Sequence, residues 1–124
     1  MTKWTIDELT KIGNAEELQI AALRSDGTLR KPVTIWVVRL DDDLYVRSVN
    51  GRSSAWFRGV LVRHLGSIRA GGVEKDVSFV EQADPGLNDR LDAAYRLKYR
   101  HYVESTRHIT SPEARSATLQ LLPR

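Results

Sequence analysis

Short segments of the chain alternate between apolar and polar residues, which is the spacing typical of β-strands. Residues 33–40 form the most apolar segment, and their β-branched side chains predict a central strand buried on both faces. Similar patterns predict strands over 17–24 and 44–49, a two-stranded hairpin with a glycine turn over 67–81, and a closing strand over 117–122. The chain is therefore expected to contain about six short strands.

Three other segments carry apolar residues at helical spacing: residues 6–13, 55–64 and 88–103. Residues 106–112 are polar and predict a loop. Antiparallel hairpins with three inserted helices predict an α+β fold, either a small barrel or a curved sheet. A chain of 124 residues has the length of one domain, so a single domain is expected over residues 1–124.

Capping residues predict where two of these helices begin and end. Thr5 and Glu8 have the spacing of a capping box, in which each side chain bonds the main-chain N–H of the other residue. Ser53 or Ser54 is expected to cap the second helix. Gly66 is expected to end it, because glycine readily adopts the positive φ of a helix C-terminus.

Composition excludes several classes of site. The chain has no cysteine, so it has no disulfide, no zinc–thiolate site and no cysteine nucleophile. It shows neither the apolar stretch of an export signal after Met1 nor a run of about 18 apolar residues that could span a membrane. The expectation is a cytoplasmic protein with no membrane partner.

The distribution of charge is more informative than the net charge of +3. Residues 44–73 contain no aspartate or glutamate, and the acidic residues gather on either side of them. A basic centre with acidic margins predicts a local site for an anion. Nucleic-acid binding is a weaker alternative, because no recognition motif accompanies the arginines. The arginines of this segment are Arg47, Arg52, Arg58, Arg63 and Arg69.

The first candidate cluster combines Thr28, Arg30, Lys31 and Thr34 beside the predicted turn at 25–28. A phosphate requires cationic and hydroxyl donors and free amides near a turn, and this segment supplies all three. The alternative is a solvated basic pair that flanks a strand and binds nothing.

The second candidate cluster surrounds a glycine turn that leads into the second predicted helix, where unpaired amides favour an anion. A tryptophan in this helix could stack on a flat ring, or it could be a core residue behind an ordinary helix cap. The two clusters lie at opposite strand ends and meet only if the barrel curves or a second subunit contributes. The second cluster consists of Ser48, Asn50, Gly51, Arg52, Ser53, Ser54, Trp56 and Arg58.

Two weaker patterns lie in the C-terminal third of the chain. His101, Glu104 and His108 have helical spacing, but hydroxyl residues interrupt the helix there, so we expect surface or interface residues and no metal site. Three tyrosines at helical spacing predict a core or subunit-interface stripe. They are Tyr95, Tyr99 and Tyr102.

The order of five motifs resembles the flavin- and deazaflavin-binding split barrels, which include pyridoxamine-phosphate-oxidase-like and deazaflavin-dependent nitroreductase-like proteins. Within that group, the chain is similar to a bacterial domain-of-unknown-function family, DUF2255. The similarity covers about residues 4–124. The motifs are DGTLRKPVTIWVV, DLYVRSVNG, SSAWFRGV, SIRAGG and DVSFVE.

The resemblance implies a six-stranded split barrel, usually a homodimer, with a phosphate-bearing cofactor in a groove beside the barrel. The implied cofactor is FMN or an 8-hydroxy-5-deazaflavin coenzyme, and the implied activity is reduction of a small organic substrate by hydride transfer. The alternative is a cofactor-free split-barrel binding protein. The implied cofactor-binding residues are Arg30, Lys31, Pro32, Val33, Thr34, Ser48, Asn50, Gly51, Arg52, Trp56 and Arg58.

Overall fold

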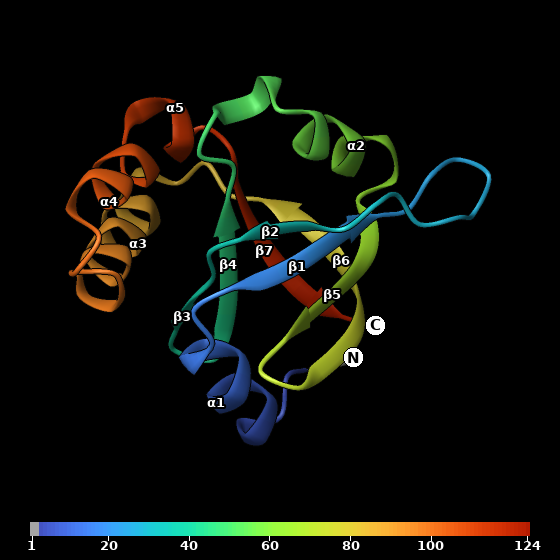
Figure 1. The fold of residues 1–124 in the computed structure, drawn as a ribbon, viewed down its shortest axis with the longest axis horizontal. Coiled ribbons are helices and arrows are strands. Elements are labelled where there is room, and N and C mark those ends of the chain that lie inside the picture. Colours follow the sequence, from blue (N-terminus) through green and yellow to red (C-terminus); the bar gives the residue numbers. More distant parts are fainter. Residues whose placement is uncertain (1–2) are drawn as a thin grey trace.

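The computed structural model describes residues 3–124 and forms one curled antiparallel sheet with helices at its margins (Figure 1). The predicted α+β class is confirmed, although the described residues form seven strands and not six. The strand order is β2-β1-β5-β6-β7-β4-β3, so the last strand in the chain, β7, lies between β6 and β4. The strands are β1 (Leu18–Ala22), β2 (Val33–Ile35), β3 (Val38–Leu40), β4 (Asp43–Arg47), β5 (Leu65–Ala70), β6 (Val73–Glu81) and β7 (Thr118–Pro123).

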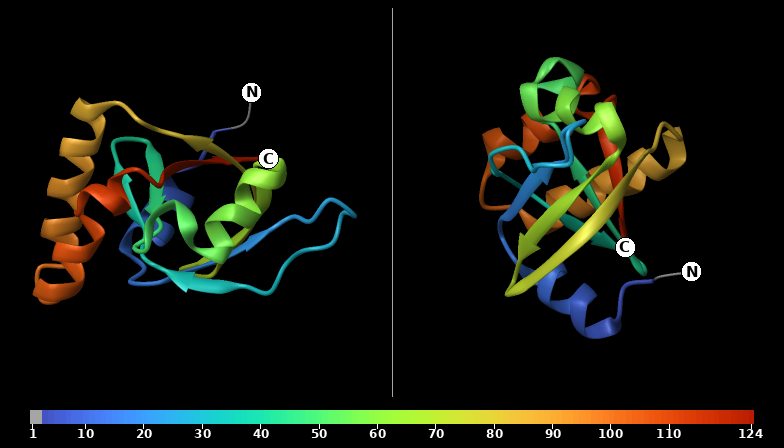
Figure 2. Two further views of the ribbon diagram at one scale, coloured as in Figure 1. Left: turned by 90° about the horizontal axis from the view of Figure 1, so that it is seen from above. Right: turned by 90° about the vertical axis from the view of Figure 1, so that its right-hand side faces the viewer.

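Helices cover three parts of the sheet. One closes an end of the barrel, a second lies beside the β1–β2 hairpin, and the C-terminal helices pack together on the side opposite the hairpin tip (Figures 1 and 2). Among residues 3–124, no helix has the length and apolarity needed to cross a membrane. The helices are α1 (Ile6–Asn14), the 3₁₀ turn η1 (Gly51–Ser53), α2 (Ala55–Arg63), α3 (Pro85–Lys98), α4 (Val103–Ile109) and α5 (Pro112–Arg115).

Residues 33–40 do not form one central strand. They are divided into β2 and β3, which are the two edge strands of the sheet. The chain bends between them at Trp36, whose ring stacks on Tyr99 with centroids 3.8 Å apart. The Tyr99 hydroxyl accepts a bond of 3.2 Å from the Val37 amide. Val33 and Thr34 are exposed, so the prediction of burial on both faces is wrong.

Lys98 holds the same bend from α3. Its ammonium donates to the carbonyl oxygens of Ala15 and Val37, each at 2.6 Å. Burial lowers the pKa of Lys98 to about 8, although the nearby Glu16 carboxylate acts in the opposite direction. The two carbonyl bonds connect the C-terminal cap of α1 to the corner between β2 and β3.

The predicted capping box is present at α1. Thr5 Oγ1 accepts from the Glu8 amide at 3.1 Å, and Glu8 Oε1 accepts from the Thr5 amide at 2.9 Å. Leu9 and Ile12 are completely buried and face the sheet. Trp4 fixes the chain just before the helix, because its indole N–H donates to the Leu121 carbonyl at 2.9 Å.

Helix α2 ends earlier than predicted. His64 adopts the left-handed conformation at its C-terminus, with φ 57°, and Gly66 lies in β5. Glycine is required at position 66 because a Cβ there would contact the Ala21 carbonyl oxygen. Ser54 is the N-cap, but its hydroxyl bonds the Ser48 hydroxyl at 2.7 Å and does not cap an amide.

The C-terminal helices also differ from their prediction. Asp84 caps α3 and Pro85 is its first residue, so the helix begins three residues before the predicted start. The predicted loop at 106–112 is mostly helical, since α4 and α5 cover it. Ser111 caps α5 through a bond of 3.3 Å from the Ala114 amide.

A buried arginine joins these helices to the sheet. The Arg47 side chain is completely buried, and Nη1 donates to Asp92 Oδ1 at 2.5 Å and to the Ile109 carbonyl at 3.1 Å. Nη2 donates to the side-chain and main-chain oxygens of Asn88 at 2.8 and 3.1 Å, and Nε donates to Thr118 Oγ1 at 3.0 Å. Arg47 is therefore a structural residue and does not contribute to the anion site that the sequence predicted within residues 44–73.

Candidate functional site

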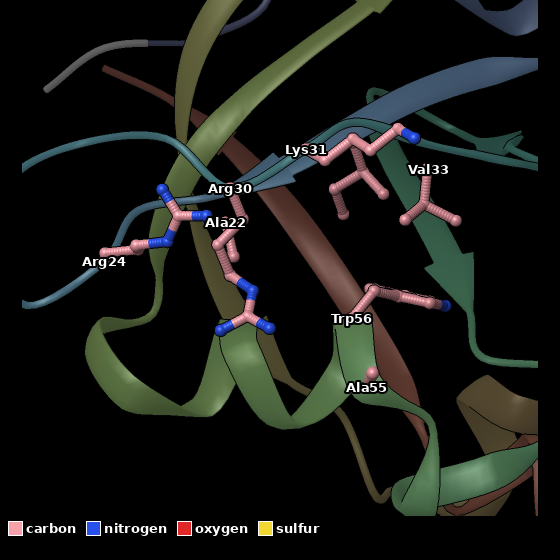
Figure 3. A pocket seen from close by; sticks show the side chains of 8 residues that line it. Ala22, Arg24, Arg30, Lys31, Val33, Ala55 and Trp56 are labelled. Carbon is pink, nitrogen blue, oxygen red and sulfur yellow. The ribbon is translucent and has the colours of Figure 1, made fainter.

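A groove runs between the β1–β2 hairpin and the N-terminal half of α2. Its first part is a hollow of about 170 Å³ with cationic residues from the hairpin and Trp56 from the helix (Figure 3). The sheet strand β1 contributes the apolar wall. The lining residues are Ile20, Ala22, Arg24, Arg30, Lys31, Val33, Ala55 and Trp56.

A second hollow of about 260 Å³ shares Trp56 with the first. It is mainly apolar and lies between the bend after β2 and helix α4. Trp56 is half-buried, and its ring meets the Phe57 ring edge-on at 5.9 Å between centroids. The residues that line the second hollow, besides Trp56, are Thr34, Ile35, Trp36, Arg47, Val49, Ser105 and Ile109.

The hairpin turn sets the positions of the arginines. Gly27 has φ 90°, and the Arg24 amide bonds the Thr28 carbonyl at 2.7 Å. The Asp26 carboxylate accepts from the hydroxyl and the amide of Thr28 at 2.7 and 3.0 Å, and these bonds lower its pKa. The Arg30 amide then pairs with the Ala22 carbonyl at 2.8 Å, which brings Arg30 beside β1.

Arg30 and Lys31 point in different directions. The Arg30 side chain runs toward α2, whereas the Lys31 ammonium points away from it along the strand (Figure 3). Among residues 3–124, neither forms an ion pair with a carboxylate. Their positive charges are therefore available to an anion at this side of the groove.

Arg52 does not reach the groove. Its Nη1 donates to Glu81 Oε1 at 2.6 Å and to the Ser116 carbonyl at 2.9 Å. Its guanidinium lies 5.2 Å from the centre of the Phe57 ring. Of the second predicted cluster, Trp56 is the residue that meets the first cluster, because the curvature of the sheet brings α2 and not the preceding turn to the hairpin.

The turn that contains the rest of the second cluster is closed by its own contacts. Gly51 has φ 75°, and a Cβ there would contact the Glu113 side chain. Ser48 is buried, whereas Asn50 and Arg58 are exposed and line neither of the two hollows.

The remaining predicted residues follow β2. Val33 lines the first hollow and Thr34 the second, so the strand runs past both. Pro32 is exposed just before the strand. Thr28 bonds Asp26 and Arg24 and shapes the turn.

Sequence reasoning missed several lining residues. Arg24 lies just after β1, on the arm of the hairpin opposite Arg30. The antiparallel bridge between Leu23 and Leu29 gives the register of the two arms, and this register would have placed Arg24 near Arg30. Ser105 and Ile109 were missed because helix α4 was predicted as a loop, and no local signal marks them.

The weaker patterns lie outside the groove. His101, Glu104 and His108 are exposed, and Glu104 pairs with Arg107 at 3.3 Å. Of the three tyrosines in the predicted stripe, Tyr95 and Tyr99 are core residues, and burial raises the pKa of both hydroxyls. Tyr102 is exposed and its hydroxyl donates to Glu16 Oε1 at 2.7 Å, so it does not belong to the core.

Solved structures of other proteins have a similar fold. A conserved hypothetical protein from Mycobacterium tuberculosis has a TM-score of 0.68 and 13% identity, over 98% of this chain and 81% of that chain. A protein from Listeria innocua named after pyridoxamine 5′-phosphate oxidase has a TM-score of 0.66 and 10% identity, over 94% and 90%. An FAD-binding protein from Mesorhizobium loti has a TM-score of 0.58 and 21% identity, over 98% and 91%.

Other similar structures carry different names. An F420-H2-dependent reductase has a TM-score of 0.62 and 12% identity, over 86% of this chain and 93% of that chain. HutZ, a heme storage protein from Vibrio cholerae, has a TM-score of 0.63 and 13% identity, over 100% and 92%. At these identities the likenesses show the split-barrel fold.

The sequence itself gives the family. No curated protein sequence matches the chain. A family model matches residues 8–121 and is described as "Uncharacterized protein conserved in bacteria (DUF2255)". The chain therefore belongs to the DUF2255 family.

Proposed function

We propose that the groove binds a flavin-type cofactor, FMN or a deazaflavin, and that the chain uses it to reduce a small organic substrate. The observation that carries this proposal is the position of Trp56 between a cationic hollow and an apolar one. A flavin-type molecule has the same two parts, an anionic chain and a flat ring. The names of the FAD-binding and F420-H2-dependent neighbours support this class of ligand.

The residues of the groove fit such a cofactor. Arg30 and Lys31 would hold the phosphate, with Arg24 beside them, because guanidinium and ammonium groups bind phosphate through charge-assisted hydrogen bonds. Trp56 would offer the ring a flat apolar surface. The cofactor would supply the hydride chemistry, and the chain would bind and orient it.

The second hollow would hold the ring of the cofactor and, beside the ring, the substrate. Its walls are mainly apolar, and Thr34 and Ser105 provide two hydroxyl groups at its margin. Such a lining favours a small uncharged molecule with one or two polar groups.

The groove is shallow for a ligand of this size. Its hollows of about 170 and 260 Å³ are each smaller than the roughly 300–1,000 Å³ of typical ligand pockets. We therefore propose that a second copy of the chain covers the open side, which accords with the homodimer that the resemblance to the split barrels implies. Light scattering with and without ligand would measure this association.

The experiment is an absorbance spectrum of the purified protein, followed by titration with FMN and with a reduced deazaflavin while tryptophan fluorescence is recorded. Binding should quench tryptophan fluorescence, because Trp56 lies between the two hollows and Trp36 lines the second. The double variant Arg30→Ala/Lys31→Ala should weaken binding by about a hundredfold or more, since it removes two charge-assisted bonds that are each worth roughly 1.5–3 kcal/mol. Arg96→Ala, an exposed arginine on α3 at the opposite side of the barrel, is the matched control. Equal affinity in all three proteins would refute the site.

A cofactor-free binding protein is the second candidate. The observation in its favour is that Arg52, one of the expected phosphate ligands, is already bonded to Glu81 and Ser116. This candidate predicts a colourless protein that binds neither FMN nor the deazaflavin. Hemin should be included in the titration because one structural neighbour is a heme storage protein.

A further inference from the structure

The cationic part of the groove continues past Arg30 into another hollow. This third hollow, of about 330 Å³, lies between the hairpin turn and the C-terminal half of α2. It shares Arg24 and Arg30 with the first hollow, so the two arginines form a common wall. Its lining residues are Leu23, Arg24, Ser25, Asp26, Arg30, Gly59 and Val62.

Helix α2 is shaped to receive the Arg30 side chain. A Cβ at position 59 would lie 3.0 Å from both Cδ and Nε of Arg30, which is closer than side-chain atoms normally approach. Gly59 therefore lets the guanidinium lie against the helix between the two hollows. One turn later, Arg63 Nη1 donates to the Arg24 carbonyl at 3.2 Å, which brings a third guanidinium to the base of the hairpin.

The charge balance at this wall is strongly positive. Within the described residues 3–124, the guanidinium groups of Arg24, Arg30 and Arg63 form no ion pair. Arg24 Nη1 bonds the Thr28 hydroxyl and the Leu29 carbonyl, at 3.3 and 3.2 Å, so its other nitrogen atoms remain as donors. Asp26 is the only acidic residue of the third hollow's lining, and Thr28 occupies its carboxylate.

We infer that this wall binds two linked phosphates, one in each hollow, so that the ligand is a diphosphate and not a monophosphate. A single phosphate would occupy one hollow and leave the donors that face the other without a partner. A diphosphate can place an anionic group on each side of Arg30, where the guanidinium groups are. The inference rests on the proposed function for the ring half of the ligand, which would then be a diphosphate-bearing flavin.

Two comparisons test this inference by calorimetry at constant ionic strength. Pyrophosphate should bind about tenfold or more tightly than inorganic phosphate, and FAD about tenfold or more tightly than FMN, because each gains a second set of charge-assisted bonds. Each comparison excludes an alternative explanation of the other. Pyrophosphate carries no adenosine, so adenosine contacts cannot explain its preference over phosphate. FAD carries no more phosphate charge than FMN, so a difference in total charge cannot explain its preference over FMN.

Variants separate this wall from a general effect of charge. Arg63→Ala and Gly59→Ala should lower the preference for pyrophosphate over phosphate by about fivefold or more, and Asp26→Asn should strengthen pyrophosphate binding, because it removes the only opposing charge in the lining. Arg96→Ala should leave the preference unchanged. Asp26 lies in the exposed turn and Arg63 is exposed, so these two variants keep the test valid if Gly59→Ala does not fold.

The outcomes distinguish the two proposals. FMN and FAD binding with equal affinity would support the flavin site and refute the diphosphate. If pyrophosphate binds, the Arg63 and Gly59 variants weaken its preference over phosphate, and no flavin binds, the diphosphate site is supported and the proposed function is refuted. No preference for pyrophosphate or FAD, or an equal loss in Arg96→Ala, would overturn the inference.

Discussion

Replacing Arg47 by methionine should strongly destabilise the fold without touching the hairpin side of the groove. Methionine approximates the length of the side chain and lacks its charge and donors. The change leaves the oxygens of Asn88 and Ile109 without the guanidinium group that donates to both, although Arg47 is completely buried. Asp92 keeps one partner, because Arg115 bonds its other oxygen at 2.6 Å.

The size of the effect follows from these contacts. Removing one member of a buried ion pair costs about 3–5 kcal/mol. The remaining Arg115 contact places the expected loss for Arg47→Met near the lower end, about 3 kcal/mol. For a chain of 124 residues, whose unfolding entropy is about 2.1 cal/mol/K per residue, this loss lowers Tm by roughly 12 °C.

Urea unfolding followed by circular dichroism and tryptophan fluorescence would measure the loss. The matched control is Arg39→Met, because Arg39 is an exposed arginine on β3 whose nearest carboxylate, on Asp42, is 3.8 Å away. Its loss should stay below about 1 kcal/mol. The double variant Arg47→Met/Asp92→Leu should lose less than the sum of its single variants, since the two side chains share a bond. A loss below about 1 kcal/mol for Arg47→Met would refute the reasoning, because buried acceptors without donors cannot cost so little.

Three further predictions concern stability. Burial lowers the pKa of Lys98 from 10.5 to about 8 in the folded chain, so between pH 8 and about 10 the unfolded chain binds this proton more tightly than the folded chain does. The free energy of unfolding should therefore rise with pH in this window. Urea titrations at several pH values would measure the rise, and Lys98→Met should remove it. Gly71→Ala should cost more than Gly72→Ala in a thermal melt. Both glycines have a positive φ, which costs an alanine about 1–2 kcal/mol. Only at Gly71 would the new Cβ also collide with the main chain of α1. Removing a helix cap by Thr5→Ala or Asp84→Ala should cost about 1 kcal/mol each, and unchanged Tm values would contradict the capping roles.

Features with local causes were predictable from the sequence. The capping box at α1 depends on two residues three positions apart, and the Asp26–Gly27 turn depends on its own backbone preferences. The glycine hairpin between β5 and β6 was predicted for the same reason. The cationic pair Arg30 and Lys31 was recognised because it adjoins such a turn.

Features that depend on residues far away in the sequence could not be predicted from it. The bend at Trp36 and Val37 depends on Tyr99, 62 positions beyond Val37, so an apolar run looked like one strand. Arg52 looked available in the sequence because its partners lie 29 and 64 positions away. Side-chain availability depends on tertiary contacts, and the local pattern around Arg52 does not contain them.

The position of β7 between β6 and β4 has a consequence for synthesis of the protein. β4 pairs with β3 and β7, and β6 pairs with β5 and β7, so within residues 3–124 the segment 118–123 is the only link in the ladder between these two parts of the sheet. A ribosome makes these residues after all the other strands. Without them, the ladder consists of two separate sets of strands, β2-β1-β5-β6 and β4-β3, and the edges at which β7 pairs are exposed. Exposed edges of this kind can pair with other chains. The two sets of strands can therefore join only after residues 118–123 have been made, whatever the stability of the earlier strands.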